Sequence, residues 1–262
     1  MHVSTTALAR EPLQAPPAVT ARPLLRDVSR DVASCTVCAL RRICMPVDIV
    51  DAQARVRFER LVATRIRRRK GEVLFRAGDR FTALFAVRVG SLKTVTLSDA
   101  GRERVTGYHL PGDIVGFEGV GNDLYACQAV ALEDTEVCTL PFDRVEQLAH
   151  DDASFQRRLY QLLSSAIMRE RAATLVVGTM RAEQRLASFL IDLSDRYQLR
   201  GYSSTEFVLR MTREEIGSHL GLKLETVSRV FSRFAEEGLL VVSGRVLKLL
   251  DRAALQRLVA AG

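Results

Sequence analysis

The 262-residue sequence has no long hydrophobic run. No segment approaches the ~18 to 20 consecutive apolar residues that a membrane-spanning helix needs. The first 23 residues also contain no apolar stretch of the kind found in secretory signal peptides. Together with a mean hydropathy of +0.04, these absences predict a globular cytoplasmic protein with no membrane association.

A large excess of one charge is also missing. The chain carries 38 Lys and Arg against 31 Asp and Glu, a formal charge of +7. Residues 181–262 contain 13 basic and 10 acidic side chains. This balance is compatible with a polyanion such as nucleic acid but does not require one, so motifs must decide.

Cysteine is scarce and clustered. Of the five cysteines, Cys35, Cys38 and Cys44 form a C-x2-C-x5-C segment, and Cys127 and Cys138 follow much later. Because thiols stay reduced in the cytoplasm, the close spacing indicates metal binding or redox chemistry before disulfides. Three thiolates on one loop can surround a single metal centre, and they need one further ligand.

The chain divides by pattern into four expected parts. Residues 1–34 hold four of the seven prolines and have no apolar periodicity, which predicts a disordered tail. Residues 35–150 are expected to be a cysteine loop followed by a β-barrel sensor domain. From about residue 70 to 140, short alternating runs are separated by turn signals every 8 to 12 residues, which favours an antiparallel barrel or jelly roll.

Residues 151–180 read as one long helix that serves for dimerisation. Apolar side chains at alternating steps of four and three form a coiled-coil seam, so a two-fold dimer is the simplest inference. The alternative is a helix packed on its own domain. Glu170 lies on the seam and would repel its copy, which predicts a poised monomer–dimer equilibrium that Glu170→Ala should tighten. The expected interface residues are Leu159, Leu163, Ala166, Glu170, Ala173 and Val177.

Residues 181–262 predict a winged helix-turn-helix. Thr212 and Glu215 match a capping box that opens a helix, and Gly221 supplies the turn to the next one. The expected elements are helices over 182–197, 212–220 and 224–237, a strand near 207–209 and a hairpin over 239–250.

The second helix of this motif has the residues of a DNA reader. Its solvent-facing positions near the N-terminus are Glu225, Thr226, Ser228 and Arg229. Arg229 can donate to guanine O6 and N7, Glu225 can accept from cytosine N4, and Ser228 can contact a thymine methyl. The alternative is an ordinary helical hairpin with an exposed Glu–Arg pair. Arg213, Arg233 and Arg245 are candidates for phosphate contacts, whereas Val227, Val230, Phe231 and Phe234 should pack inward.

These residues carry a family resemblance. The string MTREEIGSHLGLKLETVSRVFSRFAEEGLL resembles the recognition region of the Crp/Fnr transcription regulators, and its E-T-V-S-R core is similar to the Fnr type. GEVLFRAGD, GRERVTGYHLPGDIVGF and ALEDTEVCTLPF resemble the Fnr sensor domain. The resemblance implies an α+β protein with a cyclic-nucleotide-binding-like jelly-roll barrel, a dimerisation helix and a winged helix-turn-helix. It also implies that Glu225, Ser228 and Arg229 read a TTGAT half-site in a palindromic operator.

The sensor chemistry is read within this resemblance. Cyclic-nucleotide binding is not expected, because the segment GFEGVGNDLYACQAV contains Glu118 but no arginine to offset a phosphodiester. Oxygen-sensing Fnr proteins hold a [4Fe-4S] cluster on three N-terminal cysteines and one distant cysteine. The distant cysteine lies in a segment like ALEDTEVCTLPF, which implies Cys35, Cys38, Cys44 and Cys138 as ligands. Cys127 is then a buried small side chain or a spare thiol.

Other sensors remain open at this point. The same four cysteines could hold a structural zinc ion, or the loop thiols could act as a redox switch without a metal. Haem would need an axial ligand, for which His109 is the histidine in the sensor segment. Arg41 and Arg42 could stabilise an anionic cluster and Ile43 could shield it, although both arginines could equally be solvated.

The resemblance therefore implies an oxygen-responsive transcription regulator and not an enzyme. Without oxygen the cluster promotes dimerisation and DNA binding, and loss of the cluster reverses both. The turn at residues 98–101 is expected to contact RNA polymerase, which also follows from the resemblance. The alternative is a regulator of the same fold with a structural zinc or thiol-redox site and no oxygen-labile cluster.

Overall fold

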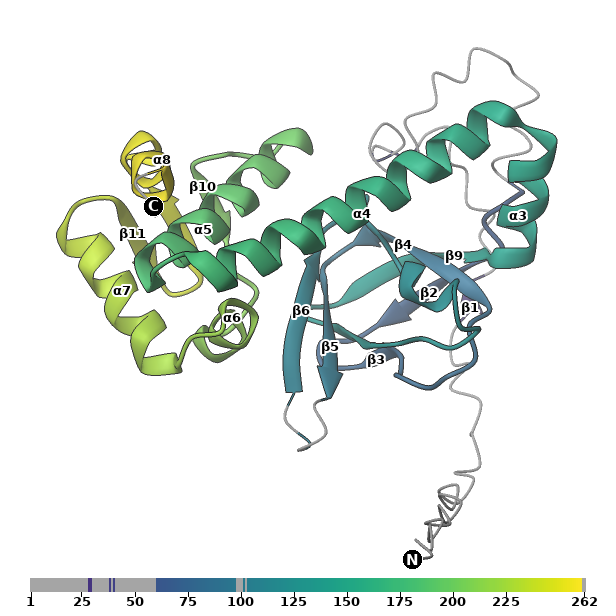
Figure 1. Ribbon diagram of the computed structural model, residues 1–262, viewed down its shortest axis with the longest axis horizontal. Helices are drawn as coiled ribbons and strands as arrows, with labels where there is room; N and C mark the ends of the chain where they lie inside the picture. The colour runs from purple at the N-terminus through teal and green to yellow at the C-terminus, as the bar shows by residue number, and fades with distance from the viewer. Residues whose placement is uncertain are drawn as a thin grey trace, which may run out of the picture.

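The computed structural model describes residues 28–29, 38, 40, 60–97, 101 and 103–260. A β-rich sensor domain and a smaller helical domain lie on either side of one long helix (Figure 1). No helix in the described part of the chain is long and apolar enough to cross a membrane. Cys35, Cys44, Arg41, Arg42, Ile43 and most of the turn at 98–101 lie outside the described residues.

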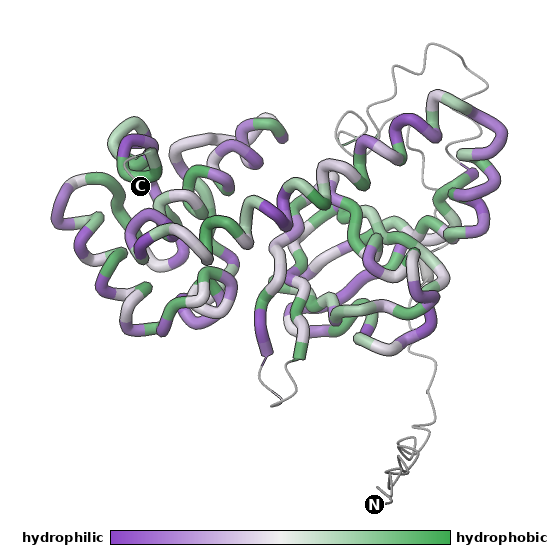
Figure 2. Tube along the Cα trace, viewed as in Figure 1, coloured by the Kyte–Doolittle hydropathy of each residue, from purple (hydrophilic) through white to green (hydrophobic). Residues whose placement is uncertain are grey.

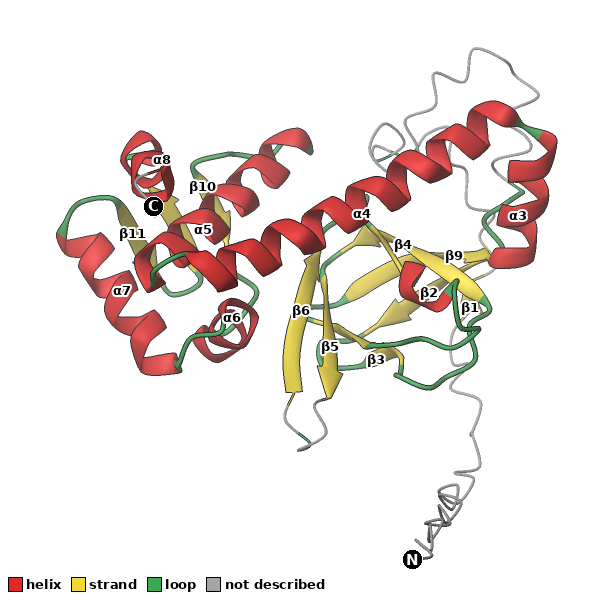
Figure 3. Cartoon of the chain, viewed as in Figure 1, coloured by secondary structure: helices red, strands yellow, loops and turns green. Residues whose placement is uncertain are grey.

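The sensor domain consists of two antiparallel sheets (Figure 3). The first has the order β1 (Val28–Ser29), β2 (Thr64–Arg68), β9 (Thr135–Pro141), β4 (Ala83–Val89) and β7 (Ile114–Val115). The second has the order β3 (Val73–Phe75), β8 (Gln128–Ala131), β5 (Leu92–Leu97) and β6 (Glu103–His109). The expected jelly roll is confirmed, but as two sheets and not as one closed barrel. Within the segment expected to be a disordered tail, β1 pairs with β2 as an edge strand.

Side chains of the sensor core come from both sheets. Leu84, Leu92 and Leu140 are almost fully buried, and Phe75, Phe85 and Tyr125 pack their rings together beside them. Gly90 makes the turn from β4 to β5 with φ of +81°, and a Cβ there would lie 2.6 Å from the Asp134 carbonyl oxygen. Only glycine fits that turn, which brings the two sheets together.

Two helices follow β9. Helix α3 (Phe142–Asp151) packs on β9 and β4, and α4 (Ala153–Thr179) runs from there to the C-terminal domain. The helical conformation is interrupted between them at Asp152. The Asp152 side chain caps α4 by accepting hydrogen bonds from the Ser154 and Phe155 amides at 2.9 and 3.1 Å. The expected long helix is therefore present, with its own cap, after a separate short helix.

The C-terminal domain has the elements of a winged helix-turn-helix. They are α5 (Ala182–Leu199), β10 (Glu206–Val208), α6 (Arg213–Leu220), α7 (Leu224–Glu236), β11 (Leu240–Ser243), β12 (Val246–Leu249) and α8 (Arg252–Ala260). The small sheet has the order β10-β12-β11. Helix α8, which packs on α5, was not predicted.

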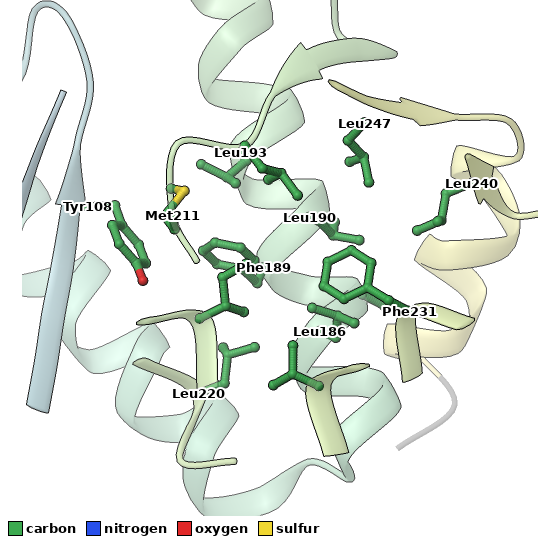
Figure 4. Packing of buried hydrophobic residues seen from close by; sticks show 14 of the residues in the cluster. Tyr108, Leu186, Phe189, Leu190, Leu193, Met211, Leu220, Phe231, Leu240 and Leu247 are labelled. Carbon is green, nitrogen blue, oxygen red and sulfur yellow. The ribbon is translucent and has the colours of Figure 1, made fainter. Parts of the chain in front are cut away.

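The core of the C-terminal domain continues onto the sensor domain. Leu186, Phe189, Leu190 and Leu193 of α5 form its centre, and Tyr108 of β6 lies beside Phe189 (Figure 4). Hydrophobic and hydrophilic segments alternate along α4 and α7, as expected for helices with one face on the core (Figure 2). The two domains are therefore packed against each other and are not merely tethered.

Candidate functional site

The helix and turn that precede α7 are fixed by local hydrogen bonds. Thr212 Oγ1 accepts from the Glu215 amide at 3.1 Å, and Glu215 Oε2 accepts from the Thr212 amide at 2.7 Å. Gly221 ends α6 with φ of +64°. The predicted capping box and glycine turn are both confirmed, and they set the direction of α7.

Helix α7 has one buried and one exposed face. Glu225, Ser228 and Arg229 are exposed near its N-terminus, and Thr226 is half-buried, 3.5 Å from Arg229 Nη2 through its hydroxyl. In Figure 1, α7 lies on the side of the domain away from the sensor. The exposed row is free to enter a groove in this arrangement. The residues predicted to face inward are all buried: Val227, Val230, Phe231 and Phe234.

Two of the expected phosphate contacts have partners within the chain. The guanidinium carbon of Arg213 lies 3.1 Å from the centre of the Phe231 ring, and burial lowers the pKa of Arg213 to about 10. Arg233 binds Glu183 at 2.7 Å and Glu237 at 2.8 Å. Arg213 therefore supports the inner face of α7, and phosphate binding by either arginine stays a prediction.

The described cysteines occupy two separate places. Cys38 and Cys138 are half-buried, and Cys138 lies on β9. Cys127 is buried, and its thiol donates to Glu118 Oε1 at 3.1 Å. Burial and the neighbouring Glu118 raise the pKa of Cys127, which makes it a poor thiolate ligand.

Cys138 has arginines as neighbours in the first sheet. In the strand register it pairs with Arg65 on β2 and with Ala86 on β4. Glu136, two residues earlier on the same face, binds Arg88 at 2.6 Å and Arg67 at 3.2 Å, and lies 3.9 Å from Arg65. Cys138 therefore lies in a strongly cationic environment.

Cys38 lies close to this group. Burial raises the pKa of Cys138, Arg65 and Arg88 oppose that rise, and a negative charge on Cys38 adds to it. Cys38 is therefore within electrostatic range of Cys138. Within the described residues no three His, Cys, Asp or Glu side chains form a metal site. Of the four predicted ligands, Cys38 and Cys138 are within electrostatic range of each other, and Cys35 and Cys44 lie outside the described residues.

This environment fits an anionic metal–thiolate centre. The two thiols supply soft donors, and the arginines beside them offset the negative charge that deprotonated thiolates bring. Cys35 and Cys44 would complete a set of four ligands, with the chemistry of either an iron–sulfur cluster or a zinc site.

A cavity of about 590 Å³ lies between the sensor domain, α4 and the C-terminal domain. Its polar lining includes Glu118, Cys127 and a chain in which Thr106 Oγ1 donates to Thr94 Oγ1 at 3.0 Å, with His109 Nε2 3.2 Å beyond. Burial lowers the pKa of His109 to about 4, so the ring is neutral at pH 7. Its Nε2 is engaged by Thr94, which favours a structural histidine over a haem ligand.

Arginines that line the cavity come from helices and not from the segment at 116–129. Arg169 lies 4.0 Å and Arg196 2.6 Å from Asp113, so both are paired with a carboxylate. The absence of cyclic-nucleotide binding stays a prediction.

The expected dimer seam on α4 lies along the cavity, and Glu170 on this seam is exposed. Leu163, Ala166, Glu170, Ala173 and Val177 line the cavity, and Leu159 packs on the sensor core. The exposed apolar residues lie about one position further along the helix: Tyr160, Ile167, Met168 and Leu175, each more than half exposed. Heptad spacing located a seam but could not show which face the sensor domain covers. Dimerisation through the six predicted residues stays a prediction.

A buried ion-pair cluster joins the two domains. Asp113 accepts from Arg196 at 2.6 Å, from Arg200 at 2.8 Å and from the Leu110 amide at 2.8 Å. Arg196 also donates to the Tyr108 carbonyl, and Arg200 to the Pro111 carbonyl. Burial alone would raise the pKa of Asp113, but the two arginines outweigh it and hold the pKa at about 2. Asp113 is therefore a permanent anion that fixes α5 against the sensor.

Sequence reasoning missed both arginine clusters. Neither cluster forms a local motif, because each carboxylate, Glu136 or Asp113, is far in the chain from the arginines that bind it. Only the strand register, which aligns Arg65 with Cys138, could have indicated the first cluster.

Comparisons with known proteins match both domains. The model of the cyclic nucleotide-binding domain matches residues 65–152, and the model of the Crp-like helix-turn-helix domain matches residues 184–258. Each match covers one of the two packed units described above.

Similar whole proteins are bacterial regulators. The transcriptional regulatory protein btr of Bordetella pertussis is 44% identical over 88% of this chain and 96% of its own length. The transcriptional activator protein anr of Pseudomonas aeruginosa is 41% identical, over 84% and 89%. The anaerobic regulatory protein of Aggregatibacter actinomycetemcomitans is 37% identical, over 84% and 86%.

A solved structure agrees with the fold. FixK2 from Bradyrhizobium japonicum is 31% identical with a TM-score of 0.71, covering 77% of this chain and all of that one. The capped helix-turn-helix, the two-sheet sensor domain and these full-length relatives lead to one conclusion: the chain belongs to the Crp/Fnr family of transcription regulators.

Proposed function

We propose that this protein is an oxygen-responsive transcription regulator of the Fnr type. It holds a [4Fe-4S] cluster on Cys35, Cys38, Cys44 and Cys138 and binds a palindromic TTGAT-type operator when oxygen is absent. The observation that carries the proposal is that one chain has both an exposed row of DNA-reading side chains on α7 and, on β9, Cys138 opposite Arg65 in the strand register. Relatives named as anaerobic regulators support the same reading.

The DNA-binding step follows from α7. Arg229 has its guanidinium on the exposed face, where two N–H groups can donate to guanine O6 and N7. Glu225, one turn earlier, offers an acceptor for cytosine N4. Because Val227 and Phe231 hold the opposite face in the core, α7 enters the groove as a rigid element.

The cysteine centre is connected to the long helix by the chain itself. Cys138 lies on β9, and α3 begins four residues later at Phe142, packs on the same sheet and leads through the Asp152 cap into α4. When bound, the cluster supplies the reactivity toward oxygen. A shift of β9 on its loss would change the position of α3 and the start of α4.

Dimerisation is proposed along α4, through the exposed residues Tyr160, Ile167, Met168 and Leu175. Apolar side chains that are more than half exposed on one helix favour a second copy as partner. Glu170, exposed beside Ile167, would repel its copy and keep the dimer weak. Two recognition helices would then lie about 34 Å apart, one DNA turn.

The remaining partners follow from the family. A cytoplasmic location, contact with RNA polymerase and the absence of cyclic-nucleotide binding are part of the proposal.

The proposal is tested by anaerobic DNA binding of the full chain. Arg229→Ala should weaken binding to a TTGAT palindrome by roughly 1 to 3 kcal/mol per half-site, and it should weaken binding to a duplex with changed half-sites much less. Arg233→Ala, a loss of charge on the same helix, should affect both duplexes alike. Air should abolish specific binding of the unmodified protein.

Two results would contradict parts of the proposal. Unchanged specific binding by Arg229→Ala would reject the recognition helix. Specific binding that survives air while Arg229→Ala loses it would retain the DNA reader and reject the oxygen response, which is the behaviour of a structural zinc or thiol site.

A further inference from the structure

The outer face of the first sheet has an excess of positive charge beside Cys138. Directly paired residues in antiparallel strands share one face of the sheet. Arg65 pairs with Cys138, and Arg67 pairs with Glu136 two residues away, so all four side chains lie on the same face. This face belongs to the sheet that leads into α3.

Arg88 reaches the same face through a β-bulge. The register between β4 and β9 shifts between Val87 and Val89, which leaves Arg88 as the extra residue. The bulge directs its guanidinium onto Glu136 at 2.6 Å. Arg88 also interacts electrostatically with both Cys38 and Cys138. The bulge thus brings a third arginine to the thiols.

The single carboxylate of Glu136 does not balance three arginines. The Arg65 side chain is only 16% exposed, and its nearest carboxylate oxygen lies 3.9 Å away. Within the described residues the buried Nε of Arg65 has no hydrogen-bond partner. A cation held so far from water needs an anion. Among the described residues, Cys138, which lies opposite Arg65 in the strand register, has a thiol that can become an anion.

The charge of a metal-bound cysteine centre is opposite in sign to this excess. Thiolates are deprotonated when they bind a metal, and a [4Fe-4S] core on four thiolates has about two negative charges in all. If the exposed Arg67 is left out, Arg65 and Arg88 against the one carboxylate of Glu136 leave an excess of one positive charge, which part of this negative charge would offset.

We propose that Arg65 and Arg88, held in place by Glu136, are the positioning cations of the cysteine centre, and that they stabilise its negative charge. This inference rests on the proposed function, since it needs the centre to be present. Arg67 does not share the role: it is 71% exposed and pairs with Glu136 rather than with Cys138. Arg67 is therefore a matched control on the same strand and the same carboxylate.

The experiment compares Arg65→Gln, Arg88→Gln, Arg65→Lys and Arg67→Gln in the full chain after anaerobic reconstitution. Loss of visible absorbance to an iron chelator without oxygen should be about tenfold faster in Arg65→Gln and Arg88→Gln, and unchanged in Arg67→Gln. Arg65→Lys keeps the charge and should stay within about twofold of the unmodified protein. Urea unfolding of the metal-free chains separates these effects from folding.

The reduction potential provides a second readout that a purely structural role would not move. Because a nearby cation favours the more negative reduced form, Arg65→Gln and Arg88→Gln should lower the potential, and Arg67→Gln should leave it in place. If the unmodified protein takes up no iron and sulfide, the proposed function and this inference both fail. If it does so and all four variants behave alike, or Arg65→Lys is as impaired as Arg65→Gln, only the arginine role fails.

Discussion

Two carboxylates in this protein each have three arginines nearby. They differ in how deeply they are buried and in which other groups contact their arginines. Asp113 lies between the two domains with Arg196, Arg200 and Arg169 at 2.6, 2.8 and 4.0 Å. Glu136 lies on the outer sheet face, with its arginines at nearly the same distances: Arg88, Arg67 and Arg65 at 2.6, 3.2 and 3.9 Å.

The arginines around Asp113 find their other hydrogen-bond acceptors within the protein. Arg196 and Arg200 donate to the Tyr108 and Pro111 carbonyls, and Arg200 also donates to the Arg196 carbonyl. Among the arginines around Glu136, Arg88 instead interacts electrostatically with the thiols of Cys38 and Cys138. Similar charge patterns thus serve two purposes: one fixes the DNA-binding domain on the sensor, and the other is built beside a site that requires anions. Stability measurements should separate them.

The largest effect is expected from Asp113→Asn. Removing the carboxylate leaves Arg196 and Arg200 buried without an anion, so the free energy of unfolding should fall by roughly 3 to 5 kcal/mol. Urea unfolding of the metal-free chain measures this. Asp192→Asn is the matched control, because it removes an exposed partner of Arg196 at 3.4 Å and should cost at most about 0.5 kcal/mol. Equal losses in the two variants would show that the buried cluster is not what holds the domains together.

The next largest effect is a pH dependence of the free energy of unfolding, caused by His109 near Asp113 and Arg196. Burial, the main cause, and the nearby Arg196 keep the pKa of His109 at about 4, below its ordinary value of about 6.5. The unfolded chain therefore binds this proton first as pH falls, and stability is lost between about pH 6.5 and 4. The loss should be about 2 to 3 kcal/mol by linkage.

His109→Gln isolates that contribution. It removes the titrating ring but leaves an acceptor for Thr94, so the fall in unfolding free energy from pH 7 to 4.5 should be smaller than in the unmodified chain. His219, whose pKa burial also lowers, stays in both proteins and cancels in the difference. Identical pH profiles would place His109 in a more hydrated environment than the cavity wall.

A smaller effect is expected at the second carboxylate. Glu136→Gln removes ion pairs in which Arg67 is 71% and Arg88 is 35% exposed, so the metal-free chain should lose at most about 1 kcal/mol. Chemical unfolding compares it directly with Asp113→Asn. A loss as large as that of Asp113→Asn would remove the distinction between the two carboxylates.

The smallest effect is expected from Lys93→Gln. Lys93 on β5 binds Glu215 at 2.8 Å, but Glu215 is also held by the Thr212 amide in the capping box. Because the helix cap survives the substitution, the loss should be about 0.5 to 1 kcal/mol. Thr212→Ala, which removes the hydroxyl of the cap, should cost about 1 kcal/mol in the same assay. A loss of stability in Lys93→Gln well above that of Thr212→Ala would show that the Lys93–Glu215 ion pair helps to hold the two domains together.

The recognition region was predictable because its signals are local. Thr212, Glu215 and Gly221 lie within ten residues, and each has a known effect on a helix end. The buried face of α7 follows from its helical spacing. The sensor fold followed from alternating runs, although the division into two sheets depends on pairings between distant strands.

Tertiary context decided what the sequence could not. On α4, Leu163 and Ala166 of the predicted seam are half-buried and line the cavity, whereas Tyr160 and Ile167 are more than half exposed, and the seam stays a prediction. Which face is covered depends on contacts far away in the chain. Arg65 and Arg88 reach Glu136 from strands about 70 and 50 residues away, and the bulge at Arg88 has no sequence signal. The choice of Cys138 over Cys127 came from resemblance, and their different surroundings support it.

The most direct test is metal analysis of anaerobically purified protein, with an absorption spectrum before and after air. The proposed cluster predicts about four iron and four sulfide per chain and a broad visible band that bleaches in air. Cys138→Ser should lose both, and Cys127→Ser, which removes the buried thiol bound to Glu118, should keep them. One zinc per chain, no metal, or a cluster that depends on Cys127 and not on Cys138 would contradict the assignment.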